Sequence, residues 1–177
     1  MQDAYRICGR GTVCRLRAFR EEDAETLYRN HCEEELRRWI PNESYADLEE
    51  AAGAARFFAR CAQENALPYV LAIEDCAAGG LIGDIGLNEV DGAPGEIEIG
   101  FSVCKSAAGR VTATEAARKM LAIGRETFGA KRIYGRVLKG NAASCRVLEK
   151  CGFRLLREEE GAPDDPYGNG MLVYVSE

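Results

Sequence analysis

Apolar and polar positions alternate with two periods along the chain, and the shorter period predicts strands. The clearest strand covers residues 96–103, where Ile97, Ile99 and Phe101 alternate with polar or small residues. One face of this strand is therefore apolar. Six other short apolar stretches are also expected to be strands, and they cover residues 12–18, 69–73, 81–87, 132–137, 153–157 and 171–175.

Apolar residues at helical spacing predict four helices. The first opens at the acidic residues 21–23, where negative charge favours a helix N-terminus. The second has Ser44 as its N-cap and an apolar stripe that starts at Leu48. The third follows a loop of small residues and continues to about Phe128, and the fourth covers residues 141–150.

The order of these elements defines the fold class. A strand and two helices are followed by a run of strands, and then by helix, strand, helix and strands. This order is typical of a mixed α/β domain. The 177 residues are enough for one buried core, and no repeat or long linker divides them. We therefore expect a single domain over residues 1–177.

Charge and hydropathy exclude two classes of partner. The net charge is −6, from 23 basic and 29 acidic residues, and no block of Lys or Arg dominates any segment. A nucleic-acid partner is therefore not expected. Since no stretch approaches the ~20 apolar residues of a membrane span, we expect no membrane segment. Residues 1–11 contain charges and no apolar run, which predicts a cytoplasmic protein without a secretory signal.

Eight cysteines occur without a CxxC pair or a compact framework. In a cytoplasmic protein this pattern predicts that most of them are reduced, packed thiols rather than disulfides. Cys104 in particular is interpreted as a small core residue. The single histidine, His31, has no cysteine at metal-ligand spacing, so no metal site is expected.

The strand 96–103 leads through a loop of small residues, 106–112, into a helix. This arrangement directs unpaired backbone N–H groups and the positive end of the helix dipole at the loop. A phosphate group suits that position. On local features alone, the loop can equally be a simple corner of the chain.

Five motifs in a fixed order give this local pattern a wider context. The chain resembles the GNAT superfamily of N-acetyltransferases, in its RimJ/RimL-like branch, from about residue 13 to residue 158. The resemblance implies a mixed sheet that splays open after the fourth strand. It also implies transfer of an acetyl group from acetyl-CoA, without a metal, to a primary amine of a protein N-terminus or a small molecule. The motifs are Glu98-Ile99-Gly100-Phe101, Ala113-Thr114-Glu115-Ala116, residues 132–137, Asn141-Ala142-Ala143-Ser144 and residues 147–153.

The resemblance also implies which residues bind the cofactor. Backbone atoms of the fourth strand would hydrogen-bond the pantetheine arm and stabilise the oxyanion, and they belong to Phe101, Ser102 and Val103. The loop that would hold the pyrophosphate consists of Ala108, Gly109, Arg110, Val111, Thr112 and Ala113. Asn141 would contact the pantetheine, and Ser144 would lie near its sulfur.

Two features depart from the family pattern. The family's loop runs Gln/Arg-x-x-Gly-x-Gly/Ala, but here Ala108 replaces the first polar residue and Val111 replaces the central glycine. Either the backbone is helical at Val111 and tolerates a β-branched residue, or cofactor affinity is reduced. Leu148 stands where many members have a tyrosine acid. Ser144 is then the candidate that stabilises the leaving thiolate, unless it is an ordinary polar residue of a first helical turn.

Attack on a thioester requires a neutral amine and therefore a base. Glu98 is our candidate base, with Glu96 or Glu89 binding a cationic acceptor, if this strand face lines the acceptor cleft. A solvated strand face is the simpler interpretation. Trp39 and Ile40 are expected either to pack a helix end or to form a wall of the acceptor pocket.

A second functional hypothesis stays open from the sequence. The altered loop is also compatible with a non-catalytic acyl-CoA-binding or interaction module whose pyrophosphate loop has degenerated. For a soluble enzyme of this size, a homodimer is the default expectation.

Overall fold

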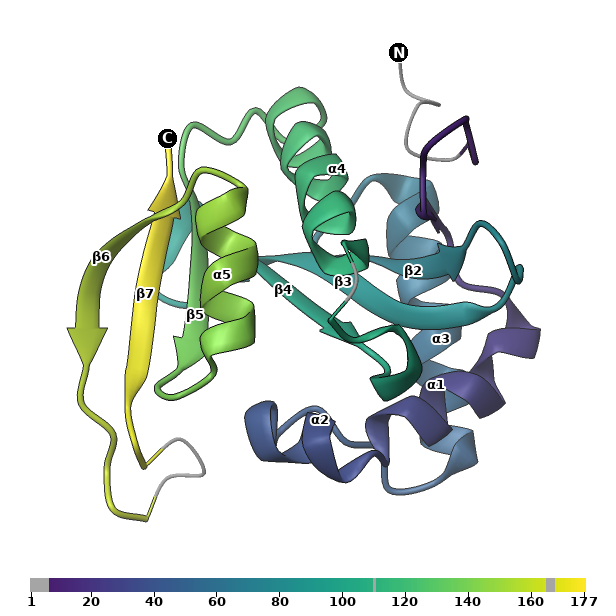
Figure 1. Ribbon diagram of the computed structural model, residues 1–177, viewed down its shortest axis with the longest axis horizontal. Coiled ribbons are helices and arrows are strands. Elements are labelled where there is room, and N and C mark those ends of the chain that lie inside the picture. The colour runs from purple at the N-terminus through teal and green to yellow at the C-terminus, as the bar shows by residue number, and fades with distance from the viewer. Residues whose placement is uncertain (1–6, 110, 165–167) are drawn as a thin grey trace.

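The computed structural model describes residues 7–109, 111–164 and 168–177. Its strands form one seven-stranded sheet in the order β1-β2-β3-β4-β5-β7-β6. Only β4 and β5 run parallel, and the other neighbours are antiparallel. The predicted mixed α/β fold is therefore confirmed (Figure 1). The strands are β1 Cys14–Arg17, β2 Tyr69–Asp75, β3 Leu81–Val90, β4 Ala93–Val103, β5 Ile133–Leu138, β6 Arg154–Glu159 and β7 Met171–Ser176.

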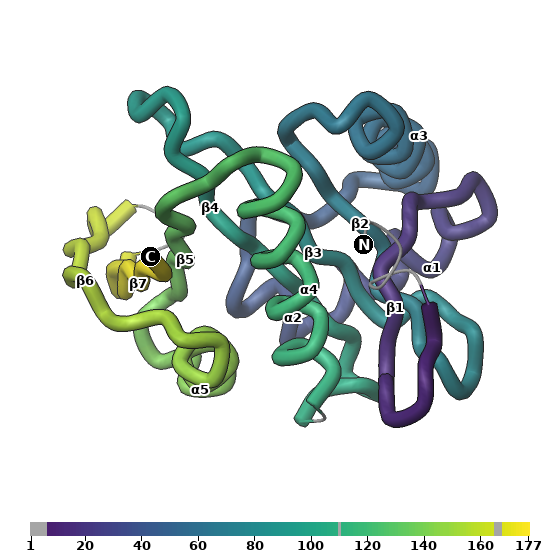
Figure 2. Tube along the Cα trace, turned by 90° about the horizontal axis from the view of Figure 1, so that it is seen from above, coloured from purple at the N-terminus to yellow at the C-terminus, as the bar shows by residue number. Residues whose placement is uncertain are grey.

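Helices cover both faces of the sheet, and Figure 2 shows α3 and α5 on opposite sides of it. Alternate residues of β2 explain the two layers, because strand side chains point to opposite faces. Leu71 packs in the same cluster as Met120 of α4, whereas Val70 packs in a second cluster with Ala55 of α3. The helices are α1 Ala24–His31, α2 Glu34–Trp39, α3 Leu48–Glu64, α4 Thr112–Glu126 and α5 Ala142–Lys150.

Two helix predictions need correction. The N-cap of α3 is Asp47 and not Ser44, because the Asp47 carboxylate accepts a hydrogen bond from the Glu50 N–H at 2.8 Å. The helix α2 was not predicted at all. It has six residues, and Leu36 is its one buried side chain, so it leaves no periodic stripe in the sequence.

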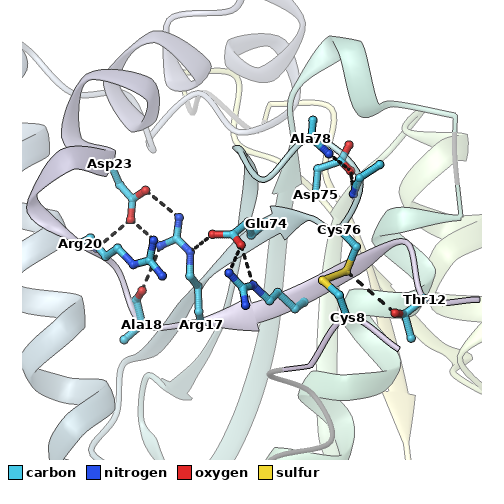
Figure 3. A network of polar contacts seen from close by, with 12 residues as sticks. Cys8, Thr12, Arg17, Ala18, Arg20, Asp23, Glu74, Asp75, Cys76 and Ala78 are labelled. Atoms are coloured by element: carbon cyan, nitrogen blue, oxygen red, sulfur yellow. Dashed lines mark hydrogen bonds and ion pairs between the residues drawn. A yellow bond between two sulfur atoms is a disulfide. The ribbon is translucent and has the colours of Figure 1, made fainter. Parts of the chain in front are cut away.

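One pair of cysteines is oxidised, since Cys8 and Cys76 form a disulfide with a Cα–Cα distance of 5.5 Å (Figure 3). These residues are 68 positions apart, and only the folded chain brings the N-terminal segment to the end of β2. The other six cysteines are free thiols, as expected, and Cys104 is buried.

A buried ionic network attaches α1 to the edge of the sheet (Figure 3). The Arg17 guanidinium on β1 donates to both carboxylate oxygens of Asp23 at 2.7 and 2.8 Å, and also to Glu74 of β2. Arg15 donates to Glu74 as well, at 2.6 Å. Burial raises the pKa of both carboxyl groups, but the arginines outweigh it and lower each pKa below its usual value. The start of α1 is therefore fixed to β1 and β2.

The sheet divides between β4 and β5. These strands pair at three positions only, and the last of them joins Ile99 to Gly135. Beyond Ile99, β4 continues beside β3, whereas β5 continues beside β7. The predicted splay after the fourth strand is confirmed. Across the described ranges, no helix is long and apolar enough to span a membrane.

Candidate active site

A pocket of about 350 Å³ lies beside the end of β4, where that strand has left β5. We call it the wedge. Five segments line it, namely the end of β4, the loop before α4, the first turn of α4, α5 and α2. Its lining residues are Glu35, Leu36, Trp39, Ile40, Phe101, Ser102, Val103, Ala107, Ala108, Gly109, Ala113, Thr114, Asn141, Ala143, Ser144, Arg146, Val147 and Lys150.

The fold brings together most of the residues that the family resemblance singled out. Val111 and Thr112 are not among the lining residues, and Arg110 lies outside the described residues. Glu98 lines a different pocket. Eight of the predicted residues line the wedge, and they are Phe101, Ser102, Val103, Ala108, Gly109, Ala113, Asn141 and Ser144.

The end of β4 offers backbone rather than side-chain groups to the wedge. The side chain of Ser102 is buried and donates a hydrogen bond to Asp84 of β3 at 3.0 Å, so it does not turn toward a ligand. Phe101 and Val103 pack against the core below α4. Because β5 has turned away, the corresponding edge of β4 has no strand partner there. An extended ligand can take up the hydrogen bonds of such an edge.

The loop before α4 accommodates valine without strain. Val111 has φ −70° and ψ −1°, an ordinary helical conformation, and it is 61% exposed. The left-handed conformation falls instead on Gly109, with φ +74°. Of the two possibilities left open by the sequence, the helical backbone at Val111 is the one observed.

The first turn of α4 supplies donors to the same end of the wedge. The N–H of Glu115 makes a helical bond to the Val111 carbonyl at 2.9 Å. The backbone N–H groups before it, such as those of Ala113 and Thr114, have no carbonyl one turn back inside the helix. They lie at the positive end of the helix dipole, where an anion is stabilised.

Helix α5 forms the opposite wall. Asn141 caps this helix, and its side-chain oxygen accepts from the Ser144 N–H at 3.2 Å. Leu148 is 1% exposed and packs on Gly135, so it is a core residue and does not reach a ligand. Arg146 and Lys150 line the wedge and were missed by the sequence analysis. Their spacing of four residues on a predicted helix is the signal that could have revealed them.

Helix α2 closes a further side of the wedge. Leu36, Trp39 and Ile40 line it, so Trp39 and Ile40 form a wall of the wedge. Their predicted place in an acceptor pocket stays a prediction. The indole N–H of Trp39 donates to Glu35 at 2.9 Å. Its ring also lies beside Gly140, in the loop between β5 and α5. The short helix therefore reaches across to the far side of the divided sheet.

The side chain of Glu98 lies on the face of the sheet opposite α4. Its neighbours Ile97 and Ile99 pack in the core cluster that includes α4, and Glu98 points the opposite way. It lines a pocket of about 310 Å³ together with Arg136, Glu159 and Glu160. Burial raises the pKa of Glu98; the positive charge of Arg136 opposes this rise, and the negative charge of Glu159 adds to it.

Along β4, Glu98 lies a short distance before the residues that line the wedge. Glu98 lies opposite Tyr134, at the last but one paired position of β4 and β5. Phe101, which lines the wedge, is three residues further on, or roughly 10 Å along the strand. The carboxylate therefore lies close to the point where the sheet opens. Glu89, in contrast, accepts from the Gly95 N–H at 3.3 Å in the turn between β3 and β4.

No group of three or more His, Cys, Asp or Glu side chains that could hold a metal ion is found among the described residues. The site thus consists of a pocket with backbone donors, a helix N-terminus and two cations, and of a partly buried carboxylate on the other face.

Comparisons with known proteins agree with this arrangement. The chain is 29% identical to the uncharacterized N-acetyltransferase YoaA of Bacillus subtilis, over 90% of this chain and 92% of that protein. Its fold is similar to the ribosomal-protein-S5-alanine acetyltransferase of Vibrio fischeri, with a TM-score of 0.80, 17% identity and 93% of each chain covered. It is also similar to the Vibrio cholerae spermidine N-acetyltransferase in complex with CoA and spermine, with a TM-score of 0.75, 16% identity, and 92% and 94% of the two chains covered.

A mixed sheet that divides beside a helix N-terminus defines a class of acyl-CoA-dependent transferase domains. A family model described as "Acetyltransferase (GNAT) domain" matches residues 14–154. The chain belongs to this GNAT family, and it is an N-acetyltransferase that uses acetyl-CoA as its acetyl donor. The hypothesis of a non-catalytic module is not favoured by these findings.

Proposed function

We propose that the wedge binds acetyl-CoA and that an amine approaches the thioester from the face on which Glu98 lies. The observation that supports this most strongly is the convergence of seven predicted cofactor-binding residues and Ser144, from three separate segments, on one pocket at the split between β4 and β5. The pantetheine arm would run along the free edge of β4. The pyrophosphate would lie at the N-terminus of α4.

The charge distribution of the wedge supports this orientation of the cofactor. Arg146 and Lys150 stand on α5, across from the first turn of α4. Both are cations that can contact phosphate groups, Arg146 with two parallel hydrogen bonds and Lys150 as a point charge. They offset the loss of a polar side chain at Ala108.

The proposed reaction is a direct acyl transfer in which each group has one role. Glu98, directly or through water, accepts a proton from the acceptor ammonium. The neutral amine attacks the thioester carbonyl, and backbone N–H groups of β4 stabilise the oxyanion. The carbon–sulfur bond then breaks as the attacking nitrogen gives up its second proton. The thiolate of coenzyme A leaves beside Ser144 and takes up that proton, directly or through water. The products are the acetylated amine and free coenzyme A.

The proposed acceptor is a primary amine of a protein N-terminus or of a small cationic molecule. Two similar structures carry names that state a ribosomal protein and spermidine as substrates. In this chain, Glu98, Glu159 and Glu160 line the same pocket, with Arg136 paired to Glu159. Such a surface favours a positively charged ligand. The homodimer, the cytoplasmic location and the absence of a nucleic-acid partner stay predictions.

Calorimetric titration with acetyl-CoA and with free coenzyme A is the experiment that tests this proposal first. Saturable binding near one molecule per chain is expected for both ligands. A screen of primary amines, with detection of released thiol, then identifies the acceptor. A folded protein that binds neither ligand at millimolar concentration would contradict the proposed site.

The loop before α4 gives a paired prediction for cofactor affinity. Val111→Gly should leave the Kd for coenzyme A within about twofold, because Val111 is exposed and already has a helical backbone. Gly109→Ala should weaken binding about fivefold, since an alanine at positive φ costs about 1 kcal/mol. Calorimetry measures both. Tighter binding by Val111→Gly would show instead that the valine compromises the loop.

A further inference from the structure

The single histidine of the chain is buried below the wedge, and the proposed reaction does not use it. His31 is the last residue of α1 and is 4% exposed. Its Nε2 lies 2.7 Å from a carboxylate oxygen of Asp84 on β3, and its Nδ1 lies 2.5 Å from the Glu43 carbonyl oxygen. The same oxygen of Asp84 accepts the hydroxyl of Ser102, a residue of β4 that lines the wedge.

These contacts specify the protonation state of His31. A carbonyl oxygen can only accept, so Nδ1 must donate to Glu43. If His31 were neutral, Nε2 would then turn a lone pair toward the negative oxygen of Asp84. With Asp84 as a carboxylate, both contacts are satisfied when the ring is positively charged.

His31 connects the chain before α2 to the chain after it. It precedes α2 by three residues, and the Glu43 carbonyl that it binds lies four residues beyond the end of that helix. The segment continues as one hydrogen-bonded unit, because the Glu43 N–H donates to Ile40 at 3.1 Å and the Ile40 N–H donates to Leu36 at 2.8 Å. The ring thus attaches this whole segment to β3 and, through Asp84 and Ser102, to β4.

We propose that protonated His31 is a positioning residue that fixes α2 and its side chain Trp39 as a wall of the wedge, and that loss of its proton loosens this wall. The groups that face His31 are Asp84 from β3, and Glu43 and Tyr45 from the segment after α2. The inference uses the proposed function only for its catalytic consequence, a rise in the KM for acetyl-CoA.

The direction of the pH dependence follows from these partners. Burial alone would lower the pKa of His31, but the hydrogen bond and charge of Asp84 outweigh it and raise that pKa above its ordinary value of 6.5. A group with a raised pKa stabilises the fold at low pH and ceases to do so as the pH rises through the raised value. The wall is therefore fixed below the raised pKa of His31 and loosens as the pH rises through it. Tyr45 stays neutral in this range, because burial raises its pKa further.

The sequence allows this to be measured without any turnover, because the chain has one histidine and one tryptophan. NMR of the imidazole gives the pKa of His31 directly, and acrylamide quenching of fluorescence gives the accessibility of Trp39. In the wild type, quenching should increase severalfold as the pH rises through the His31 pKa. A wild-type curve that stays flat while His31 titrates would overturn the proposal.

Asp84→Asn is the decisive variant. An amide nitrogen at the position of the shared oxygen can donate to a neutral Nε2 and to the Ser102 hydroxyl, so every contact survives without charge. The His31 pKa should fall below 6.5, and Trp39 quenching should become independent of pH. If Trp39 quenching still increased with pH in this variant, the role of the ion pair would be contradicted.

Two further variants complete the test. His31→Gln can satisfy only one of the two partners, so Trp39 should be easily quenched at every pH. Glu64→Gln replaces an exposed carboxylate at the end of α3 by an amide, as Asp84→Asn does at its site, and should behave as wild type. Once an acceptor is known, the KM for acetyl-CoA should rise about tenfold with pH in the wild type and not in Asp84→Asn, while kcat changes little. Because the NMR and quenching results need no acceptor, failure of the proposed function leaves them interpretable.

Discussion

Replacement of Glu98 by glutamine is expected to lower kcat about a hundredfold or more, the usual contribution of a general base. The amide keeps the size of the side chain and its place opposite Tyr134 but cannot accept a proton. The Kd for acetyl-CoA should stay unchanged, because Glu98 lines the pocket on the opposite face from Ile97 and Ile99 and not the wedge. Steady-state kinetics and calorimetry separate the two effects.

The pH profile gives an independent readout of the same residue. Burial raises the pKa of Glu98 above its ordinary value of 4.5, so the active carboxylate should be lost as the pH falls through that raised pKa. The acid limb of kcat/KM should therefore disappear in Glu98→Gln. Glu64→Gln, which changes an exposed carboxylate at the end of α3, is the control and should retain both the rate and the acid limb of the pH profile. An unaltered profile in Glu98→Gln would remove this residue from the mechanism.

Gly83→Ala is expected to lower the free energy of unfolding by about 3 kcal/mol, near the upper end of what overpacking costs. A methyl group at Gly83 would lie 2.2 Å from the Ser102 carbonyl oxygen and 3.1 Å from the Val103 Cα. Both are backbone atoms of β4, so β3 and β4 would have to separate. Urea denaturation measures the loss of stability.

The same substitution should also weaken coenzyme A binding, since the displaced residues Ser102 and Val103 line the wedge. Gly80→Ala is the control. Its added methyl group would meet nothing within 4 Å, and Gly80 does not have a positive φ. If Gly83→Ala were as stable as this control, the close approach of β3 and β4 at Gly83 would be refuted.

Strands and long helices of this protein follow from local patterns. The alternation over residues 96–103 predicted β4 and its apolar face, because strand side chains point alternately to two faces. The stripe that begins at Leu48 predicted α3, although its cap proved to be Asp47. Eight of the residues predicted from the resemblance to the GNAT family line one pocket. The segments that carry these residues meet because order along the chain fixes which strand end meets which helix.

Short elements and side-chain contacts did not follow from those patterns. Helix α2 has a single buried side chain and depends on tertiary contacts, yet it forms one wall of the wedge. Arg146 and Lys150 gain their position from the face that α5 turns to the pocket. The conformation of Val111 also depended on how the loop enters α4.

The sequence by itself determined the α/β fold class, because this depends on periodicity and order. The family, the splayed sheet and the segments that line the wedge followed from the motifs that resemble the GNAT superfamily. Only the tertiary structure decided that Cys8 joins Cys76, that Glu98 opens on the opposite face from α4, and that His31 binds Asp84. Each of these depends on residues distant in the chain that meet only after the sheet and its two helical layers have packed. Periodicity describes one segment at a time, so it contains no information about contacts between residues that are distant in the chain.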